Sequence, residues 1–522
     1  MEKITSLAKR RGFIFQSSEI YGGYQGFWDY GPAGVEMKNN IKREWWKYTV
    51  YDREDVVGID AAIIMNPVVW EKSGHLKALT DPLVECKKCN KRFRTDNIVS
   101  EKDLAEVWHR YDLKIQDLHA SARIDIKSQE NLLSATSEIL KDSTIPDEQK
   151  DKIFNGLSKI IKEKNKDADS KIKQSASFID SFHESLKYQG WFVQEVLNTR
   201  IPCPNCGEYG RWSEPKTFNL MTEVLLGTTE PKEKSYLRGE ITQGAFVDFK
   251  NVVDSTRVRI PFGIAQIGKA FRNEITPGNL TFRSREFEQM ELEYFVKPDE
   301  EDSKKIFEYW KEKRRRWYED LGIDPKKLKF RDHEPEKRAH YAKYATDLEY
   351  EAPFGWSEFE GIHHRGDFDL GNHNLSYKDN LTGEEYTPWV IETSGGVDRA
   401  MLFFLIDAYR EDGKRVYLKL HPKIAPYKVA VFPLLANKPE LLSKAKEIYK
   451  NLKQKFNVVW DARGNIGKRY FAQDEIGTPW CVTVDFESLD DATVTVRDRD
   501  SAKQERIAID NLTEYFQNKL AA

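Results

Sequence analysis

The feature that most constrains this chain is the segment 262–294, which has the pattern of an antiparallel hairpin. It reads FGIAQIGKAFRNEITPGNLTFRSREFEQMELEY, an apolar arm, a turn at Pro277-Gly278-Asn279 and a return arm. Charged residues of both signs occupy the arms: Arg272, Glu274, Arg283, Arg285, Glu286, Glu288 and Glu291. Such charges on strands that otherwise have a buried pattern indicate either a polar ligand or an ordinary hairpin with solvated charges. This segment alone does not decide between the two.

A second segment, PWVIETSGGVDRAMLFFL at 388–405, favours the ligand. We expect a strand that ends in Glu392, a turn at Gly395-Gly396, and a helix opened by Asp398-Arg399. A helix N-terminus offers backbone N–H groups to an anion, and Arg399 would add a full positive charge. Two arginine-bearing elements of this kind in one chain indicate a nucleotide site.

These segments resemble a known family. FRNE (271–274) and GVDR (396–399) are similar to motifs 2 and 3 of class II aminoacyl-tRNA synthetases. More narrowly, the chain resembles the homodimeric (α2) type of glycyl-tRNA synthetase. The blocks that carry this resemblance are LAKRRGFIFQSSEIYGG near the N-terminus, DYGPAGVEMKNNIKREWW (29–46), GIDAAIIMNPVVWEKSGH (58–75), YLRGEITQGAFVDFKNV (236–252), GWSEFEGIHHRGDFDL (355–370) and GNIGKRYFAQDEIGTPWCVTVDF (464–486). The resemblance covers most of the chain except about 101–195.

The resemblance implies an α+β fold with three parts. A class II catalytic core, an antiparallel sheet with flanking helices, would comprise 1–99 and 191–420. A helical insertion would occupy 100–190, with two cysteine pairs at its base. A mixed α/β anticodon-binding domain would occupy 424–522, where the strand patterns KVAVF (428–432), VVW (458–460), WCVTV (480–484) and TVTVR (493–497) and helices from Pro439 and over 511–520 are expected.

The implied activity is a two-step ligation. Glycine would react with ATP, with Mg²⁺ present, to form glycyl-adenylate and pyrophosphate, and glycine would then pass to the 3′-terminal adenosine of tRNA(Gly). Two alternatives remain: a non-catalytic, synthetase-like nucleic-acid-binding accessory protein, and a class II synthetase of neighbouring specificity such as prolyl or threonyl. A P-loop ATPase is excluded because GNIGK (464–468) lacks the spacing of that motif.

The resemblance also assigns roles within an ATP site. Arg272 would hold the α-phosphate, Glu274 would accept from the adenine amino group, and Phe287 would stack on the ring. Arg283 and Arg399 would hold the β- and γ-phosphates, and Glu358 would be the magnesium ligand, so Arg272, Arg399 and Glu358 are the expected catalytic residues. The full predicted ATP site is Arg272, Asn273, Glu274, Phe282, Arg283, Ser284, Arg285, Glu286, Phe287, Glu358, Phe359, Gly396, Val397, Asp398 and Arg399.

A glycine site is implied beside it. Carboxylates would bind the ammonium group, with Glu240, Glu288 and Glu392 as candidates, and Ser394 with the two glycines would close the floor. The full predicted set is Arg94, Glu240, Phe287, Glu288, Gln289, Met290, Glu291, Arg365, Glu392, Thr393, Ser394, Gly395 and Gly396. The chain departs from the family at 238–244, which reads RGEITQG where the family more commonly reads RPETAQG. Motif 1, around Pro67, implies a homodimer.

Cysteine spacing predicts a metal centre. Cys86-x2-Cys89 and Cys203-x2-Cys206 are two knuckles whose thiolates suit the four corners of a zinc tetrahedron, with Cys481 left over in an apolar strand pattern. A structural zinc is therefore expected, the alternatives being disulfides or four reduced thiols. Between the pairs, apolar residues recur at helical spacing, interrupted by Pro146, so that we expect two or more amphipathic helices without site residues.

Composition limits the remaining classes. A net charge of −3 argues against indiscriminate nucleic-acid binding, although local basic patches remain compatible with tRNA. No apolar run approaches the roughly 18 residues of a membrane span, and the N-terminal segment lacks an apolar signal sequence. A cytoplasmic protein without membrane association is expected.

Overall fold

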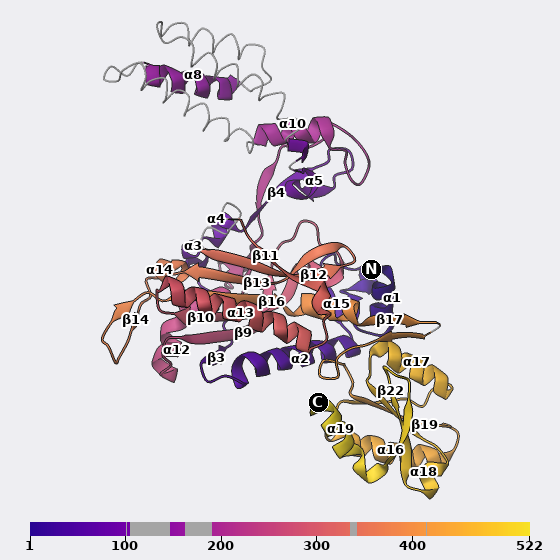
Figure 1. The fold of residues 1–522 in the computed structure, drawn as a ribbon. Coiled ribbons are helices and arrows are strands. Elements are labelled where there is room, and N and C mark those ends of the chain that lie inside the picture. The colour runs from indigo at the N-terminus through magenta and orange to yellow at the C-terminus, as the bar shows by residue number, and fades with distance from the viewer. Residues whose placement is uncertain (101, 105–146, 162–189, 335–341, 414, 522) are drawn as a thin grey trace. The chain divides into compact units, whose positions relative to one another are not determined.

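The computed structural model describes residues 1–522 except 101, 105–146, 162–189, 335–341, 414 and 522 (Figure 1). The described chain forms two compact units, one of residues 1–79 with 220–522 and the other of residues 80–219. None of the described helices is both long and apolar enough to cross a membrane.

The first unit is built on a seven-stranded sheet with the order β11-β12-β13-β16-β10-β9-β3. The strands are β11 (Leu328–Asp332), β12 (Tyr344–Ala352), β13 (Gly355–Gly366), β16 (Trp389–Gly396), β10 (Glu286–Val296), β9 (Phe262–Phe271) and β3 (Val56–Ile59). All neighbours pair antiparallel except β3 and β9, which are parallel. This is the helix-flanked antiparallel sheet expected for an α+β fold.

The predicted hairpin is confirmed as β9 and β10, which pair from Phe262↔Phe295 to Phe271↔Glu286. Because side chains alternate along a strand, β10 presents two different faces. Met290, Leu292 and Tyr294 belong to the main hydrophobic core, whereas the odd-numbered neighbours Glu291 and Glu293 point to the opposite face. The turn between the strands contains Asn279 and Leu280 at positive φ and the short helix η3 (Leu280–Phe282).

Helices cover both faces of the sheet. The main core packs α2 (Pro32–Trp46), α13 (Glu300–Asp320) and α15 (Val397–Ala408) against one face (Figure 1). A second cluster packs α11 (Thr242–Val247), α12 (Phe249–Thr256) and α14 (Phe368–Asn372) against the other. The helix α15 is buried on nearly every side, which explains its continuous apolar sequence.

The expected Gly395-Gly396 turn is wrong. Strand β16 continues through both glycines, with Gly396 in extended conformation (φ −87°, ψ 124°), and α15 starts directly at Val397. The absence of a side chain at Gly395 has a packing reason, because a Cβ there would lie 3.2 Å from both Glu360 Oε2 and the Tyr318 hydroxyl. The glycine permits a close approach between strand and core.

Further elements of this unit surround the sheet. They are α1 (Glu2–Arg10), β1 (Ile14–Gln16), η1 (Glu19–Tyr21), β2 (Trp28–Tyr30), the π-helical turn η2 (Lys47–Tyr51), α3 (Pro67–Lys72), α4 (His75–Ala78), β7 (Thr222–Leu226), β8 (Glu233–Leu237), η4 (Pro325–Lys327), β14 (Tyr377–Lys378), β15 (Glu385–Tyr386), β17 (Tyr409–Asp412) and β18 (Arg415–Leu418).

The C-terminal part has its own five-stranded sheet with the order β20-β19-β21-β22-β23. Its elements are β19 (Val429–Pro433), α16 (Pro439–Lys453), β20 (Val458–Trp460), α17 (Ile466–Ile476), β21 (Trp480–Val484), α18 (Glu487–Asp490), β22 (Thr493–Asp498), β23 (Gln504–Ala508), η6 (Ile509–Asn511) and α19 (Leu512–Ala521). Strand β19 is parallel to β20 and β21, and β22 and β23 are antiparallel additions. One apolar cluster lies under α16 and α19, and a smaller one, which includes Cys481, lies under α17.

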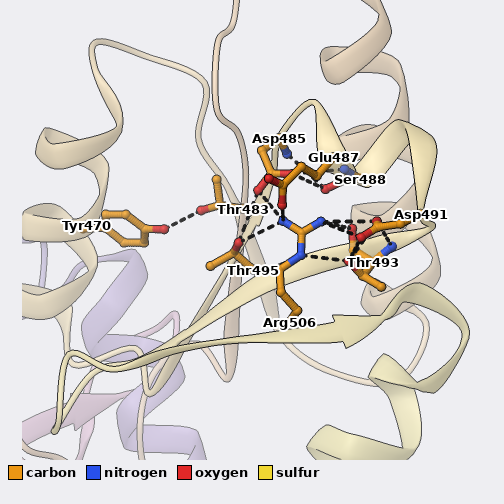
Figure 2. Close-up of polar contacts among 9 residues, drawn as sticks. All are labelled: Tyr470, Thr483, Asp485, Glu487, Ser488, Asp491, Thr493, Thr495 and Arg506. Carbon is orange, nitrogen blue, oxygen red and sulfur yellow. Dashed lines mark hydrogen bonds and ion pairs between the residues drawn. The ribbon is translucent and has the colours of Figure 1, made fainter.

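Arg506 on β23 is enclosed by acidic groups, as Figure 2 shows. Its guanidinium lies 2.7 Å from Asp485, 3.3 Å from Glu487 and 3.3 Å from Asp491. These contacts tie the turn between β21 and α18 to the edge strand. Because Arg506 is partly exposed, each pair contributes no more than about 1 kcal/mol to stability.

The second unit contains a three-stranded sheet of β5 (Arg92–Arg94), β4 (Thr80–Glu85) and β6 (Lys216–Asn219). Its described helices are α5 (Thr95–Ile98), α8 (Asp147–Ile161) and α10 (Gly190–Arg200). Ile153 and Leu157 of α8 are buried, as the helical spacing predicted. The rest of the helices expected in 100–190 falls largely outside the described residues.

Candidate active site and metal centre

The face of the large sheet beneath α11 and α14 carries a cluster of polar side chains from adjacent strands. Strand pairing brings Glu291 of β10 opposite Gln266 of β9 and Ser394 of β16. One step along, Glu293 lies opposite Glu392, which in turn lies opposite His363 of β13. A sheet face that carries several buried carboxylates is costly unless cations or a ligand compensate them.

Glu291 is held from two sides. It accepts hydrogen bonds from Thr242 at 2.7 Å and from Gln289 at 2.7 Å, and it also contacts the Ser394 hydroxyl. Burial, together with the charges of Glu392 and Glu240, raises the pKa of Glu291 to about 8. Near neutral pH this carboxyl group is therefore largely protonated when no cation lies beside it.

Glu392 is compensated by two cationic side chains. Arg365 contacts one of its oxygens and also pairs with Asp369 of α14 at 2.6 Å, and His363 Nδ1 lies 3.1 Å from the other oxygen. Burial opposes ionisation, but Arg365 and His363 outweigh it and lower the pKa of Glu392. Glu392 is thus an ionised carboxylate fixed in position.

Glu293, opposite Glu392 on the neighbouring strand, differs from it in having no cationic partner among the described residues. Both of its carboxyl oxygens are buried and lack a hydrogen-bond partner among the described residues. Burial and the charge of Glu392 raise its pKa well above the ordinary value, so that the neutral form is favoured.

Glu240 lies just before α11 and is ionised. Burial acts to raise its pKa, but the charge and hydrogen bond of His75, and the charges of Arg365 and Arg272, lower it strongly. His75 Nε2 lies 2.9 Å from Glu240 Oε1. The positive charges of Arg365, at the carboxylate cluster, and of Arg272, on the hairpin, therefore both act on Glu240.

Arg272, directly after β9, and Phe287 of β10 form the neighbouring part of the site. The Arg272 guanidinium carbon lies 5.5 Å from the centre of the Phe287 ring, and its Nε donates to the Gly239 carbonyl at 2.9 Å. Arg283 Nε lies 3.9 Å from the buried Glu274 carboxylate, and Arg285 Nε donates to the Glu274 carbonyl. The hairpin thus brings the predicted phosphate, adenine and ring-stacking residues into one region.

A β-bulge at Phe359 brings Glu358 towards the same region. Glu358 pairs with Glu349 across the strands and Glu360 pairs with Leu348, so Phe359 is an extra residue on β13. Phe359 and Glu360 are both buried in the core, and Glu358 pairs with Arg399 at 2.9 Å. The charges of Arg399, His363 and Arg272 lower the pKa of Glu358, although burial opposes the shift.

Several predicted site residues lie elsewhere. Glu288 is on the opposite face of β10, 3.1 Å from Lys38 and from Lys42 of α2. Asp398 is buried against Tyr30 and Lys38, and its Oδ2 accepts from the Glu288 backbone N–H. Other predicted residues also lie away from the polar cluster. Met290, Phe359 and Val397 are in the main core, and Thr393 and Gly395 are on the core face of β16. Glu286 pairs with Lys269, and Arg94 pairs with Asp81 in the 80–219 unit.

Sequence reasoning missed other polar residues of the cluster: His75, Thr242, Gln266, His363 and Asp369. All five lie in segments that the sequence singled out, His75 in 58–75, Thr242 in 236–252, Gln266 in 262–294, and His363 and Asp369 in 355–370, but the sequence assigned them no role. Thr242 lay in RGEITQG, the segment that departs from the family, and its hydroxyl supports Glu291. The departure therefore provides a hydrogen-bond donor to the cluster.

The four knuckle cysteines converge in the 80–219 unit. Their Sγ atoms all lie within 4.8 Å of one another, with Cys86–Cys206 at 3.7 Å and Cys89–Cys203 at 3.6 Å. A tetrahedron with Zn–S bonds of about 2.3 Å has Sγ–Sγ edges of about 3.8 Å, so the arrangement fits a zinc ion. The cluster supplies four thiol ligands and can bind a metal.

Comparisons with known proteins agree with this geometry. A family model described as the tRNA synthetase class II core domain (G, H, P, S and T) matches residues 225–408, and an anticodon binding domain model matches residues 428–519. The glycine–tRNA ligase of Caldanaerobacter subterraneus subsp. tengcongensis is 43% identical over 535 residues, covering 100% of this chain and 98% of that protein. Those of Alkaliphilus oremlandii and Streptomyces coelicolor are each 42% identical with the same coverage.

Proposed function

Because the chain belongs to the glycine–tRNA ligases, enzymes with a class II synthetase core, we propose that the carboxylate cluster binds glycine and that the hairpin beside it binds ATP. The observation that carries this proposal is the group of carboxylates next to Arg272, of which Glu291 and Glu392 are buried and Glu240 is largely buried. An amino acid with its ammonium group at the carboxylates and its own carboxylate towards Arg272 would complement both charges.

At the glycine end, Glu240 and Glu392 supply ionised oxygens and Ser394 supplies a hydroxyl that already contacts Glu291. We assign Glu291 the role that sequence reasoning left to Glu288, because Glu288 faces Lys38 and Lys42. A side chain on Cα would have to displace these close-packed groups, which explains selection of the smallest amino acid by steric exclusion. No smaller amino acid requires removal, so an editing domain is unnecessary.

The pKa of Glu291 predicts a pH-dependent affinity. With a pKa of about 8, Glu291 is mostly protonated at pH 7, and a glycine ammonium beside it favours the ionised form. Glycine binding should therefore release a proton, and affinity should rise about fivefold from pH 7 to pH 8 and level off above about pH 9, at about tenfold in all. Calorimetric titration with glycine at pH 7 in two buffers of different ionisation enthalpy measures the proton release. Glu291→Gln should bind glycine weakly and without proton release; proton release that persists in this variant would contradict the assignment.

At the ATP end, Arg272 would hold the α-phosphate, with Phe287 stacked on the adenine and Glu274 accepting from its amino group. Arg283 and Arg399 would hold the β- and γ-phosphates. Glu358, an ionised and half-exposed carboxylate, is the group that would hold Mg²⁺, which neutralises phosphate charge when bound. Asp398 instead holds α15 to α2 and β10 through Tyr30, Lys38 and the Glu288 N–H.

The chemistry needs alignment and charge stabilisation rather than a protein nucleophile. A carboxylate oxygen of glycine attacks the α-phosphorus of ATP and pyrophosphate leaves, while Arg272 stabilises the charge that develops on the phosphoryl oxygens. The 3′-hydroxyl of the terminal tRNA adenosine then attacks the carbonyl carbon of the adenylate, and AMP leaves. The mixed anhydride is already activated, so neither step requires a covalent enzyme intermediate.

Amino-acid-dependent ATP–pyrophosphate exchange tests the proposal directly. Exchange should occur with glycine and not with alanine, serine, proline or threonine. Exchange with proline or threonine would support a neighbouring specificity. A folded protein without any exchange would support the accessory-protein alternative.

We further propose a division of the chain into a catalytic core of 1–99 and 191–420, a helical insertion of 100–190 and an anticodon-reading domain of 424–522. The last rests on the anticodon binding match at 428–519. A tRNA(Gly) would then contact the C-terminal sheet at one end and present its 3′ adenosine to the core.

The cysteine cluster supports a structural zinc. We expect about one zinc per chain by elemental analysis of the purified protein, because four thiolates at tetrahedral spacing form a closed site. Cys203→Ser should lower the zinc content several-fold, whereas Cys481→Ala, in the C-terminal apolar cluster, should leave it unchanged. Full zinc retention by Cys203→Ser would contradict the assignment.

We propose a homodimer. Ile63, Ile64 and Val68, which flank Pro67 in the motif 1 segment, are exposed and apolar, as expected of a surface that a second copy covers. Sedimentation equilibrium should give about twice the chain mass of 60.9 kDa. The described cysteines are free thiols, as expected in a reducing compartment, which supports the cytoplasmic location that we also propose.

A further inference from the structure

Ser73, between α3 and α4, and His75, the first residue of α4, form a chain of polar contacts that ends at Glu240. Ser73 Oγ lies 2.7 Å from His75 Nδ1, and His75 Nε2 lies 2.9 Å from Glu240 Oε1. Both Ser73 and His75 are buried, and the His75 ring packs edge-on against Trp70 at 5.3 Å between ring centres. The imidazole is therefore held on three sides.

The local sequence makes this geometry possible. Asn66 caps α3 by accepting from the Val68 N–H at 3.0 Å, which fixes where the helix starts. Gly74 has φ +80°, a conformation that side chains disfavour, and it lets the chain reverse between α3 and α4 within one residue. The reversal brings Ser73 and His75 to the same side of the segment.

The direction of the hydrogen bonds follows from the charge on Glu240. An ionised carboxylate only accepts, so His75 Nε2 must donate to it. The Ser73 hydroxyl can donate to Nδ1 of a neutral imidazole or accept from Nδ1–H of an imidazolium, so the contact exists in either protonation state. Ser73 thereby fixes the ring orientation that presents Nε2 to Glu240.

We propose that His75, supported by Ser73, is a positioning residue for amino-acid recognition: it fixes one carboxylate oxygen of Glu240 so that the other is directed to the glycine ammonium. This inference rests on the proposed glycine site. Arg272 and Arg365 act on Glu240 as charges, whereas His75 Nε2 lies 2.9 Å from Glu240 Oε1, a buried oxygen to which the described residues donate no well-aligned hydrogen bond. The orientation of the carboxylate therefore depends on His75.

A purely structural histidine would affect stability and both substrates alike. A positioning residue affects the KM for glycine while the KM for ATP stays constant. In ATP–pyrophosphate exchange we expect His75→Leu to raise the KM for glycine about tenfold or more, the effect of removing a hydrogen bond to a charged group. His75→Gln, whose amide can donate from near the position of Nε2, should restore most of the affinity, and Ser73→Ala should show a smaller rise.

The controls separate this inference from the proposed function. His421→Gln changes a histidine whose Nδ1 accepts from the Lys423 N–H, remote from the carboxylate cluster, and should match the wild type. Glu240→Gln should raise the KM for glycine, and adding His75→Leu to it should cause little further change, because both act through one contact.

Three outcomes overturn one claim or the other. An unchanged glycine KM in His75→Leu with a raised one in Glu240→Gln would overturn the positioning role alone. Equal losses for ATP and glycine in His75→Leu and Ser73→Ala, with lowered melting temperatures, would assign both residues to stability and also overturn it. An unchanged glycine KM in Glu240→Gln would overturn the glycine site itself.

Discussion

Arg272→Ala is expected to reduce glycine-dependent ATP–pyrophosphate exchange by about 10³-fold or more while the protein remains folded. Removing a single preorganised donor from a site of developing charge typically costs about 10²–10³ in rate, and Arg272 would also supply a full charge and a second donor. Among the described residues, its position is set by the Gly239 carbonyl and the Phe287 ring and not by an ion pair with a carboxylate, which leaves the guanidinium available to phosphate.

Arg272→Lys refines this prediction. Lysine keeps the charge but lacks the planar fork, so that exchange should recover only partly, to about 10–100-fold below the wild type. Arg331→Ala is the matched control: Arg331 lies on the edge strand β11 of the same sheet, is itself exposed, and pairs with the buried carboxylates of Asp347 and Glu349. Loss of activity in the control, or near-normal exchange in Arg272→Ala, would show that Arg272 does not act at the reacting phosphate.

Glu360→Gln is expected to destabilise the catalytic core by about 3–5 kcal/mol, the usual cost of leaving a buried charge without its partner. Glu360 and Arg314 are fully buried, with Arg314 Nε and Nη2 at 2.6 and 3.2 Å from the two Glu360 oxygens and the Tyr318 hydroxyl at 2.6 Å. Glutamine has a similar shape but no charge, so Arg314 would remain buried without a counter-ion.

The measurement is thermal unfolding of the full chain, in which the transition of the core should fall by about 10 °C. The double variant Arg314→Met/Glu360→Leu removes both charges and should melt closer to the wild type than Glu360→Gln does, because apolar groups avoid the cost of charge burial. A Glu360→Gln transition within 2 °C of the wild type would mean that the pair contributes little to stability.

The hairpin and its arginines could be predicted from sequence because strand period and turn chemistry are local. The face that each charge occupies could not. Glu288 and Glu291 have the same character in the sequence, but their spacing of three places them on opposite sides of β10, one beside Lys38 and Lys42 and the other beside Thr242.

Two further features could not be predicted from the sequence, for different reasons. The bulge at Phe359 reverses the alternation of β13, so that Glu358 and Glu360 face different sides although they are two residues apart. In the C-terminal sheet, strands β19 to β22 could be predicted, whereas α17 was missed. Its inward face carries Arg469, Gln473 and Asp474, which lack the apolar period of an amphipathic helix.

The two ends of the 80–219 unit lie side by side, which determines where the chain can change in length. The Leu220 N–H donates to the Leu79 carbonyl at 3.0 Å, and the next residues pair as Thr80↔Asn219 on β4 and β6. The chain therefore leaves and re-enters the core at a single point, and the cysteine cluster draws Cys86 and Cys89 to Cys203 and Cys206 just beyond it. Insertions, deletions or replacements between residues 90 and 202 therefore leave the path of the chain through the catalytic sheet unchanged. The pairing of β4 with β6 and the cysteine cluster hold the two ends of this segment together whatever its length.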